Sequence, residues 1–279
     1  MKVGIVGLGL IGGSLGLDLR SRGLEVLGVS RRRSVCEIAR DRGAVDEASV
    51  DLALLQKADV IFICTPLSAI APTVQQLIPL VSSNTILTDV GSVKQSIAAT
   101  CSKLSPNFVG GHPMAGTAEQ GIEAAQANLF AGAPYVLTPT ETTPATALKV
   151  VEDLVGLLDA RLYICSPARH DRAVAFISHL PLFASAGLIQ TCLRESDSEV
   201  LQLAQKLASS GFRDTSRIGG GNPELGVAIA RHNRLELARS LRQYRQVLDT
   251  LIEEIEGENW DAIEQSLQEN QGARPDFLN

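Results

Sequence analysis

The chain has 279 residues, of which 45% are hydrophobic and 20% are charged, so it can bury a core and is not an intrinsically disordered chain. A net charge of −6 and an aromatic content of only 4% argue against a protein that binds the nucleic-acid backbone or stacks on its bases. We find no apolar run long enough to span a bilayer and no signal or transit segment, and the five cysteines are scattered without a CxxC pair. We therefore expect a cytoplasmic protein with reduced thiols and a small-molecule ligand, and no metal, membrane or nucleic-acid partner.

The net negative charge lies at the end of the chain. Residues 236–279 contain ten Asp or Glu and four Arg, so residues 1–235 carry no net charge. Because the excess is confined to one segment, an acidic chain can still bind an anionic ligand within its first 235 residues.

The first part of the chain alternates between two patterns. Fully apolar runs, typical of strands buried on both faces of a parallel sheet, alternate with helical periodicity. The expected strands are 3–6, 26–29, 60–64, 85–87, 108–110, 135–137 and 161–165, and the expected helices are 11–22, 34–42, 69–80, 93–104 and 145–158. This alternation predicts an α/β fold, with a Rossmann-type nucleotide-binding domain over residues 1–166.

After Ser166-Pro167 only helical periodicity remains, with helices expected at 171–194, 198–208 and 233–256. In the last of these, apolar residues at three- and four-residue steps form one stripe, which consists of Leu237, Leu241, Tyr244, Leu248, Leu251 and Ile255. We expect an all-α domain over residues 167–279. A long helix with such a stripe often packs against a second copy of itself, so we also expect a homodimer.

A GxGxxG motif directly follows the first strand and opens the first helix. It consists of Gly7, Leu8, Gly9, Leu10, Ile11 and Gly12. In this context the three glycines allow a tight turn, close approach of a pyrophosphate, and close packing of helix on strand. The helix N-terminus then offers free N–H groups to the phosphates. The alternative is a glycine-rich turn that binds nothing.

The second strand is followed by Ser30, Arg31, Arg32 and Arg33. A site for NAD would place Asp or Glu there to accept a hydrogen bond from the ribose 2′-hydroxyl. Hydroxyl and guanidinium donors suit a 2′-phosphate instead, so the sequence predicts NADP as the cofactor. The alternative is a solvated arginine run at the edge of the sheet.

Two further strand ends should face the same crevice. Thr65-Pro66 follows one strand and could contact the cofactor, or could be an ordinary turn. Gly91-Ser92 lies in the segment DVGSVK (89–94), where Ser92 could bind a ligand or cap the next helix.

Three other segments hold candidate functional side chains. His112 lies at a strand end in GGHPMAG and could accept a proton near neutral pH, although a lone His is more often structural. His179 lies in an apolar helix, where a buried, hydrogen-bonded His is the simpler interpretation. Arg213 and Arg217, in GFRDTSR, could hold a carboxylate or be surface charges.

Taken together, the segments GLGLIGGS, DVGSVK, HPMAG, ISHLP and GFRDTSRI make the whole chain similar to the prephenate/arogenate dehydrogenases of tyrosine biosynthesis. The resemblance implies a nucleotide-binding domain followed by a helical dimerisation domain. It also implies that a ring carbon bearing a hydroxyl loses a hydride to the nicotinamide, and that the resulting ketone loses carbon dioxide and becomes aromatic.

The resemblance also implies roles for particular residues. His112 would accept the hydroxyl proton, and Ser92 would hydrogen-bond the hydroxyl and orient His112. Arg217 would hold the side-chain carboxylate of the substrate, with Arg213 near it, and His179 would lie close to the substrate ring.

Within this resemblance, the choice between arogenate and prephenate as the substrate depends on one position, residue 182. Many prephenate-using relatives read HLPH where this chain has His179-Leu-Pro-Leu182, so a donor for the keto acid is missing and L-arogenate is favoured over prephenate. A β-hydroxyacid dehydrogenase or pyrroline carboxylate reductase would share the architecture, but the former needs a catalytic Lys in the helical domain, which has only Lys206. A non-catalytic NADP sensor would need the glycine motif, but not His112, Ser92 and Arg217 together.

Overall fold

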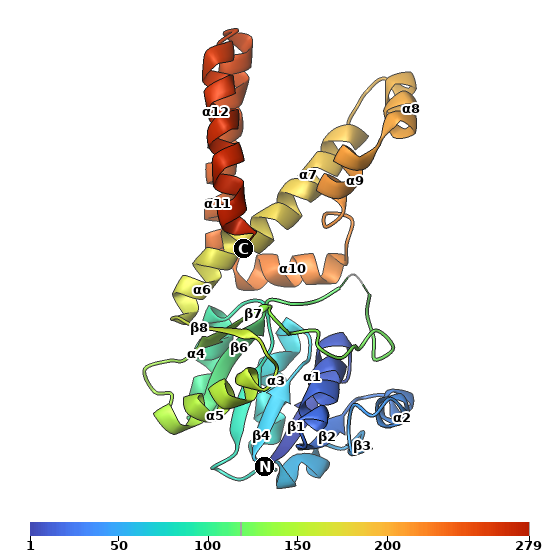
Figure 1. Ribbon diagram of the computed structural model, residues 1–279, viewed down its shortest axis with the longest axis vertical. Helices are drawn as coiled ribbons and strands as arrows, with labels where there is room; N and C mark the ends of the chain where they lie inside the picture. The colour runs from blue at the N-terminus through green and yellow to red at the C-terminus, as the bar shows by residue number, and fades with distance from the viewer. Residues whose placement is uncertain (118, 279) are drawn as a thin grey trace.

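The computed structural model describes residues 1–117 and 119–278. Figure 1 shows a lower part, built around a sheet with helices packed on both sides, and an upper part made only of helices. The helices of the upper part form two arms, one containing α7, α8 and α9 and the other containing α11 and α12.

The sheet has eight strands in the order β3-β2-β1-β4-β5-β6-β7-β8. They are β1 (Lys2–Val6), β2 (Glu25–Val29), β3 (Glu47–Ser49), β4 (Val60–Ile63), β5 (Ile86–Asp89), β6 (Phe108–Pro113), β7 (Pro134–Thr138) and β8 (Arg161–Ile164). The first six are parallel, β7 is antiparallel to β6, and β8 is parallel to β7. The predicted α/β Rossmann-type fold is therefore confirmed, although β3 was not expected, because its three residues include no apolar run.

The helices that follow the strands lie in two groups. They are α1 (Leu10–Ser21), α2 (Arg33–Asp41), the 3-10 helix η1 (Leu52–Lys57), α3 (Leu67–Leu77), α4 (Gln95–Leu104) and α5 (Ala145–Gly156). One apolar cluster joins the sheet to α1, α2 and α5, and a second joins it to α3 and α4. Both faces are thus covered, which is why the strands read as continuous apolar runs.

The helical part contains more helices than the sequence predicted. They are α6 (Pro167–Val174), the π-helical turn η2 (Ala175–His179), α7 (Leu180–Leu193), α8 (Ser198–Leu207), α9 (Ser210–Ser216), α10 (Pro223–His232), α11 (Arg234–Glu256), α12 (Trp260–Ala273) and the 3-10 helix η3 (Arg274–Phe277). The segment around Arg213, for which no helix was expected, forms the short helix α9, and α10 and α12 were not predicted either.

The helix expected at 171–194 begins earlier and is interrupted. It starts at Pro167, where the Ser166 hydroxyl accepts a hydrogen bond from the Arg169 N–H, and it contains the π-helical turn before Pro181. Proline has no N–H to donate to the preceding turn, so the regular bonding pattern is disturbed there. The result is one long helical element in which a π-helical turn, ending at His179, separates α6 from α7.

This same element, Pro167–Leu193, is long and apolar enough to cross a membrane by length and composition, with a mean hydropathy of 1.5. That contradicts the expectation that the chain holds no such run, which was judged from strictly uninterrupted apolar stretches. Length and composition are only a weak indication of a span here, because the element also holds His170, Asp171 and His179, which are buried and hydrogen-bonded to other elements.

Candidate active site

The four segments that the sequence singled out in the sheet domain lie at one edge of the sheet, the one formed by the carboxyl ends of its parallel strands. β1, β4, β5 and β6 are neighbours and run parallel, so the segments that follow them are brought to the same end. These segments hold the glycine motif, Thr65, Ser92 and His112, of which His112 is still within β6. A crevice at the carboxyl ends of such strands is where α/β proteins bind ligands.

The turn between β1 and α1 has the shape of a phosphate cradle. Gly7 has a φ of +98°, and a Cβ atom on it would lie 2.5 Å from the Cys64 carbonyl oxygen. A Cβ on Gly12 would overlap the Gly7 carbonyl oxygen, whereas the space beside Gly9 is open. Gly9 caps α1 without a side-chain hydrogen bond and the first turn has no acid, so its N–H groups are available to an anion. The residues present therefore fit a dinucleotide pyrophosphate.

The residues predicted to select NADP follow β2 at the same edge. Arg31 and Arg32 are exposed, and neither forms an ion pair within residues 1–117 and 119–278. Arg32 is the N-cap residue of α2, and the Ser30 N–H donates to the Ser49 carbonyl oxygen at 3.2 Å. This geometry is compatible with binding of a 2′-phosphate and with a solvated arginine run, so the selection of NADP stays a prediction.

Two buried hydroxyl groups at the crevice have no hydrogen-bond partner among the described residues. They belong to Thr65, which lies between β4 and α3, and to Ser92, which lies between β5 and α4. The proposal that Ser92 caps the helix is wrong, because α4 begins at Gln95 and its N-cap is Lys94. Leaving a buried hydroxyl unpaired costs free energy, so these two groups are candidates for contact with a ligand.

A buried ion pair stabilises the floor of the site. The Lys94 side chain is fully buried, and its ammonium group pairs with Asp89 and donates to the Gly111 carbonyl oxygen at 2.7 Å. Asp89 also accepts from the N–H groups of Gly91, at 2.9 Å, and Gly111, at 3.1 Å. Burial lowers the pKa of Lys94, and the nearby Asp89 carboxylate opposes that shift. The pair thereby joins β5, the turn after it, and the backbone next to His112.

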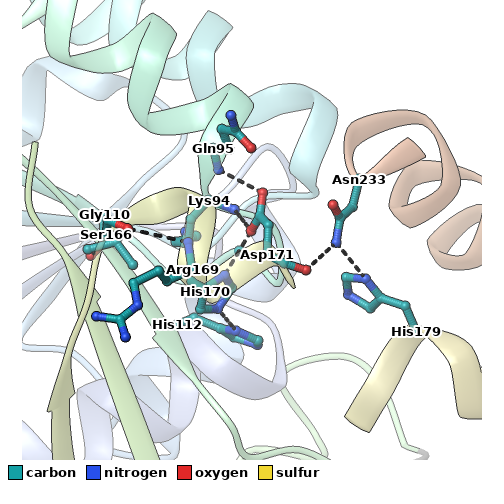
Figure 2. Close-up of polar contacts among 12 residues, drawn as sticks. Lys94, Gln95, Gly110, His112, Ser166, Arg169, His170, Asp171, His179 and Asn233 are labelled. Carbon is teal, nitrogen blue, oxygen red and sulfur yellow. Dashed lines mark hydrogen bonds and ion pairs between the residues drawn. The ribbon is translucent and has the colours of Figure 1, made fainter. Parts of the chain in front are cut away.

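His112 is at the inner end of a relay of hydrogen bonds (Figure 2). Its Nδ1 atom lies 2.8 Å from Nε2 of His170, and Nδ1 of His170 lies 2.8 Å from the Asp171 carboxylate. That carboxylate also accepts from the backbone N–H groups of Lys94, at 2.7 Å, and Gln95, at 2.8 Å. Burial, and then the neighbouring His170, hold the pKa of His112 well below its usual value. His112 is therefore neutral near pH 7 and can accept a proton.

His179 is fully buried and lies on the other side of Asp171 (Figure 2). Its Nδ1 atom lies 3.1 Å from Nδ2 of Asn233, which also donates to the Asp171 carbonyl oxygen at 2.8 Å. Burial lowers the pKa of His179 to about 4. Because its Nε2 atom has no partner among the described residues, hydrogen bonding within the fold accounts for only one of its two ring nitrogens.

The two candidate arginines are not brought to this cluster within one chain. Arg213 is exposed on α9 and pairs with Asp214 at 3.2 Å, and Arg217 is exposed at the end of the same helix. Figure 1 shows α9 beside α7, in an arm that projects from the sheet domain. Their position in one chain is that of surface charges, so their role in binding substrate stays a prediction.

Four of the residues that are hydrogen-bonded to one another around His112 and His179 were not predicted as site residues. They are Lys94, His170, Asp171 and Asn233. Lys94 ends the DVGSVK motif, which could have drawn attention to it, and the adjacent pair His170-Asp171 follows the expected domain boundary. Nothing in the sequence pairs His170 with a residue 58 positions earlier, and Asn233 stood only as the start of an expected helix.

Comparisons with known proteins identify the family of the chain. Residues 15–164 match the family described as the nucleotide-binding domain of prephenate dehydrogenase, and residues 166–269 match its dimerization domain. The chain is 30% identical to a prephenate dehydrogenase of Lactococcus lactis subsp. cremoris, over 99% of this chain and 80% of the relative.

Two solved structures are also similar. An arogenate dehydrogenase from Synechocystis is 54% identical, with a TM-score of 0.90 over 99% of this chain and 100% of that chain. A prephenate dehydrogenase from A. aeolicus, in complex with hydroxyphenyl propionate and NAD+, is 28% identical, with a TM-score of 0.94 over 99% of this chain and 98% of that chain.

Proposed function

Because the chain belongs to the prephenate/arogenate dehydrogenase family, we propose that it converts L-arogenate to L-tyrosine by oxidative decarboxylation, with NADP as the hydride acceptor. The family places it among the oxidoreductases of aromatic amino acid biosynthesis that use a nicotinamide dinucleotide. The observation that carries the proposal is the position of His112, which is buried at the same sheet edge as the phosphate cradle, where burial lowers its pKa.

The residues of the cluster would divide the chemistry among them. The nicotinamide, when bound, supplies the hydride acceptor. Nδ1 of His112 is engaged by His170, so Nε2 is the ring nitrogen that would accept the proton of the substrate hydroxyl. The unpaired hydroxyl of Ser92 would donate to, or accept from, the same oxygen. Once the ring carbon is a ketone, loss of carbon dioxide is driven by formation of the aromatic ring.

Two observations favour arogenate over prephenate as the substrate. Leu182 offers no hydrogen bond to a keto acid, and its side chain packs towards α10, 3.8 Å from where a Cβ on Gly226 would lie. The second is the similarity to an arogenate dehydrogenase at 54% identity. The dehydrogenase alternative that depends on Lys206 is not favoured, because Lys206 is exposed on α8 in the projecting arm (Figure 1).

A kinetic matrix of two substrates against two cofactors tests the function. We expect the highest kcat/KM for arogenate with NADP, followed at the absorbance of NADPH. A higher kcat/KM for prephenate with either cofactor would overturn the substrate assignment. Tight binding of NADP without turnover of either substrate would instead support the sensor alternative.

Ser30→Asp should shift the preference from NADP towards NAD. A carboxylate at this position repels a 2′-phosphate and accepts a hydrogen bond from a 2′-hydroxyl. We expect kcat/KM for NADP to fall by about 10-fold or more, which is the loss of about one charged hydrogen bond. The control is Ser34→Asp in α2. Unchanged affinity for NADP in Ser30→Asp and also in Arg31→Ala would contradict the predicted 2′-phosphate site.

Arg217→Ala should chiefly raise the KM for the substrate, because a carboxylate contact made in the ground state and the transition state alike is lost. We expect a rise of about 10-fold or more, the value of a charge-assisted hydrogen bond. Arg245→Ala is the matched control, since Arg245 is exposed on α11 and its nearest carboxylate, that of Asp249, lies 3.8 Å away. Equal KM values in the two variants would exclude Arg217 from substrate binding.

The helical part would form a homodimer. Leu237 is buried in the stripe on α11, but Tyr244, Leu248 and Ile255 are 38%, 39% and 55% exposed, so half of the six stripe residues are exposed in one chain. Exposed apolar surface of this kind is typical of an interface, and the match to the dimerization domain supports a second copy of the chain as the partner.

All five cysteines are free, which is compatible with a cytoplasmic location.

A further inference from the structure

The relay behind His112 contains two residues, His170 and Asp171, to which the proposed function assigns no chemical role beyond the contact of His170 with Nδ1 of His112. His170 and Asp171 are 2% and 1% exposed and lie on α6, whereas His112 lies on β6. The relay therefore crosses from the helical part to the sheet domain at the position of the proposed base. Because every contact in it is at hydrogen-bonding distance, the position of each proton can be derived from the end that is fixed.

That end is the Asp171 carboxylate. An ionised carboxylate can only accept hydrogen bonds, and here it already accepts from two backbone N–H groups, those of Lys94 and Gln95. These groups cannot reverse their direction, so they hold the carboxylate in place. The third group at 2.8 Å, Nδ1 of His170, must therefore donate its proton to Asp171.

When His170 is neutral, the proton on its Nδ1 fixes the direction of the hydrogen bond between the two rings. A neutral imidazole carries one N–H and one lone pair, so Nε2 of neutral His170 is an acceptor. The partner of that acceptor is Nδ1 of His112, at 2.8 Å, which must then be the donor. His112 is left with its lone pair on Nε2, the nitrogen that has no partner in the relay.

We propose that His170 and Asp171 are positioning residues, which hold His112 in its Nδ1–H tautomer and so direct the Nε2 lone pair at the substrate hydroxyl. The proposal rests on the proposed function only for the identity of that hydroxyl. A neutral imidazole in water favours the opposite tautomer, in which Nε2 carries the proton and cannot accept another. The relay also stabilises the imidazolium that forms when His112 takes the proton, because the positive charge is hydrogen-bonded towards a fixed carboxylate.

The tautomer can be measured without any substrate. The chain has four histidines, so protein labelled with ¹⁵N in histidine gives few imidazole signals, and His112→Ala identifies those of His112. We expect His112 in the wild-type protein to be protonated at Nδ1 and unprotonated at Nε2. In His170→Leu we expect the Nε2–H form to become populated. A wild-type His112 that carries its proton on Nε2 would overturn the proposal, whatever the enzyme's substrate is.

Kinetics give a second readout, which a purely structural role would not produce. His170→Leu should lower kcat by about 10²-fold or more, since a catalytic His in the wrong tautomer can lose up to about 10⁴-fold. KM and the Kd for NADP should stay within about 3-fold, because no binding contact is removed. His170→Gln should recover most of the loss, since its amide oxygen can accept from His112 while its NH₂ group donates to Asp171.

The matched control is His232→Leu. His232 bonds to Ser96 through Nδ1 at 3.2 Å and has no contact with the relay, so this variant should keep kcat near the wild-type value. If folded His170→Leu keeps its kcat, or if His170→Gln is as impaired as His170→Leu, the positioning role is refuted. If His170→Leu does not fold, the tautomer in the wild-type protein still decides the question.

Discussion

His112→Ala is expected to lower kcat by about 10²–10⁴-fold, which is the usual contribution of a positioned acid–base group. The reason is that the variant removes Nε2 of His112, the ring nitrogen that we propose accepts the substrate proton at the sheet edge beside the cradle. The Kd for NADP should be largely unchanged, because the glycine motif follows β1, whereas His112 lies on β6. Steady-state kinetics and a titration with NADP measure the two quantities separately.

The pH profile gives a further check on the same residue. His112 works as a base when neutral, and burial lowers its pKa well below 6.5. The acidic limb of kcat/KM should therefore lie below pH 6.5, with activity retained as the pH rises from there towards neutrality.

A fully active His112→Ala variant, or one that loses NADP binding in the same proportion as kcat, would contradict the role assigned to His112.

Lys94→Met is expected to destabilise the protein by about 3–5 kcal/mol, the usual cost of removing one partner of a buried ion pair. Both side chains of the pair are inaccessible to solvent, so the Asp89 carboxylate would lose the cation that it pairs with among the described residues and could not be solvated by water. The free energy of unfolding in urea measures the loss. The exposed pair of Lys149 with Asp153 supplies the control, because Lys149→Met removes a solvated contact and should change stability little.

A double variant distinguishes the effect of the unpaired Asp89 charge from the effect of lost packing of Lys94. Asp89→Asn combined with Lys94→Met removes both charges while the amide oxygen can still accept from the Gly111 N–H, so stability should return part of the way to the wild type. The recovery would identify the unpaired charge, and not lost packing of Lys94, as the main cause. If Lys94→Met and the wild-type protein have the same urea midpoint of unfolding, the ion pair does not contribute to stability in the way described.

Several features followed from short stretches of sequence. The parallel strands were predictable because a strand buried on both faces must be apolar throughout, and the helices between them because their period is local. The glycine motif was predictable because its strand–turn–helix context occurs within 20 residues. His112 was identified by its motif. Short or partly exposed elements such as β3, α9 and α10 gave no periodic signal of sufficient length.

The partners of these residues could not be predicted, because they depend on how the helical part packs against the sheet domain. A helix cap was one of the two interpretations that the sequence left open for Ser92, but α4 begins at Gln95 and the side chain of Lys94 is buried against Asp89. His170 comes from a different domain than His112, and only docking of α6 beside α4 brings Asp171 to the backbone N–H groups that hold it.

The sequence by itself determined the fold class and the glycine cradle and predicted His112 as the base, because each is encoded in neighbouring residues by period, turn geometry or motif. The tertiary structure decided the burial and the hydrogen-bond partner of His112 and left Arg213 and Arg217 at the surface of one chain. Both outcomes depend on burial and on contacts between distant segments, which change the cost of a charge and the direction of a hydrogen bond. No local pattern records such contacts.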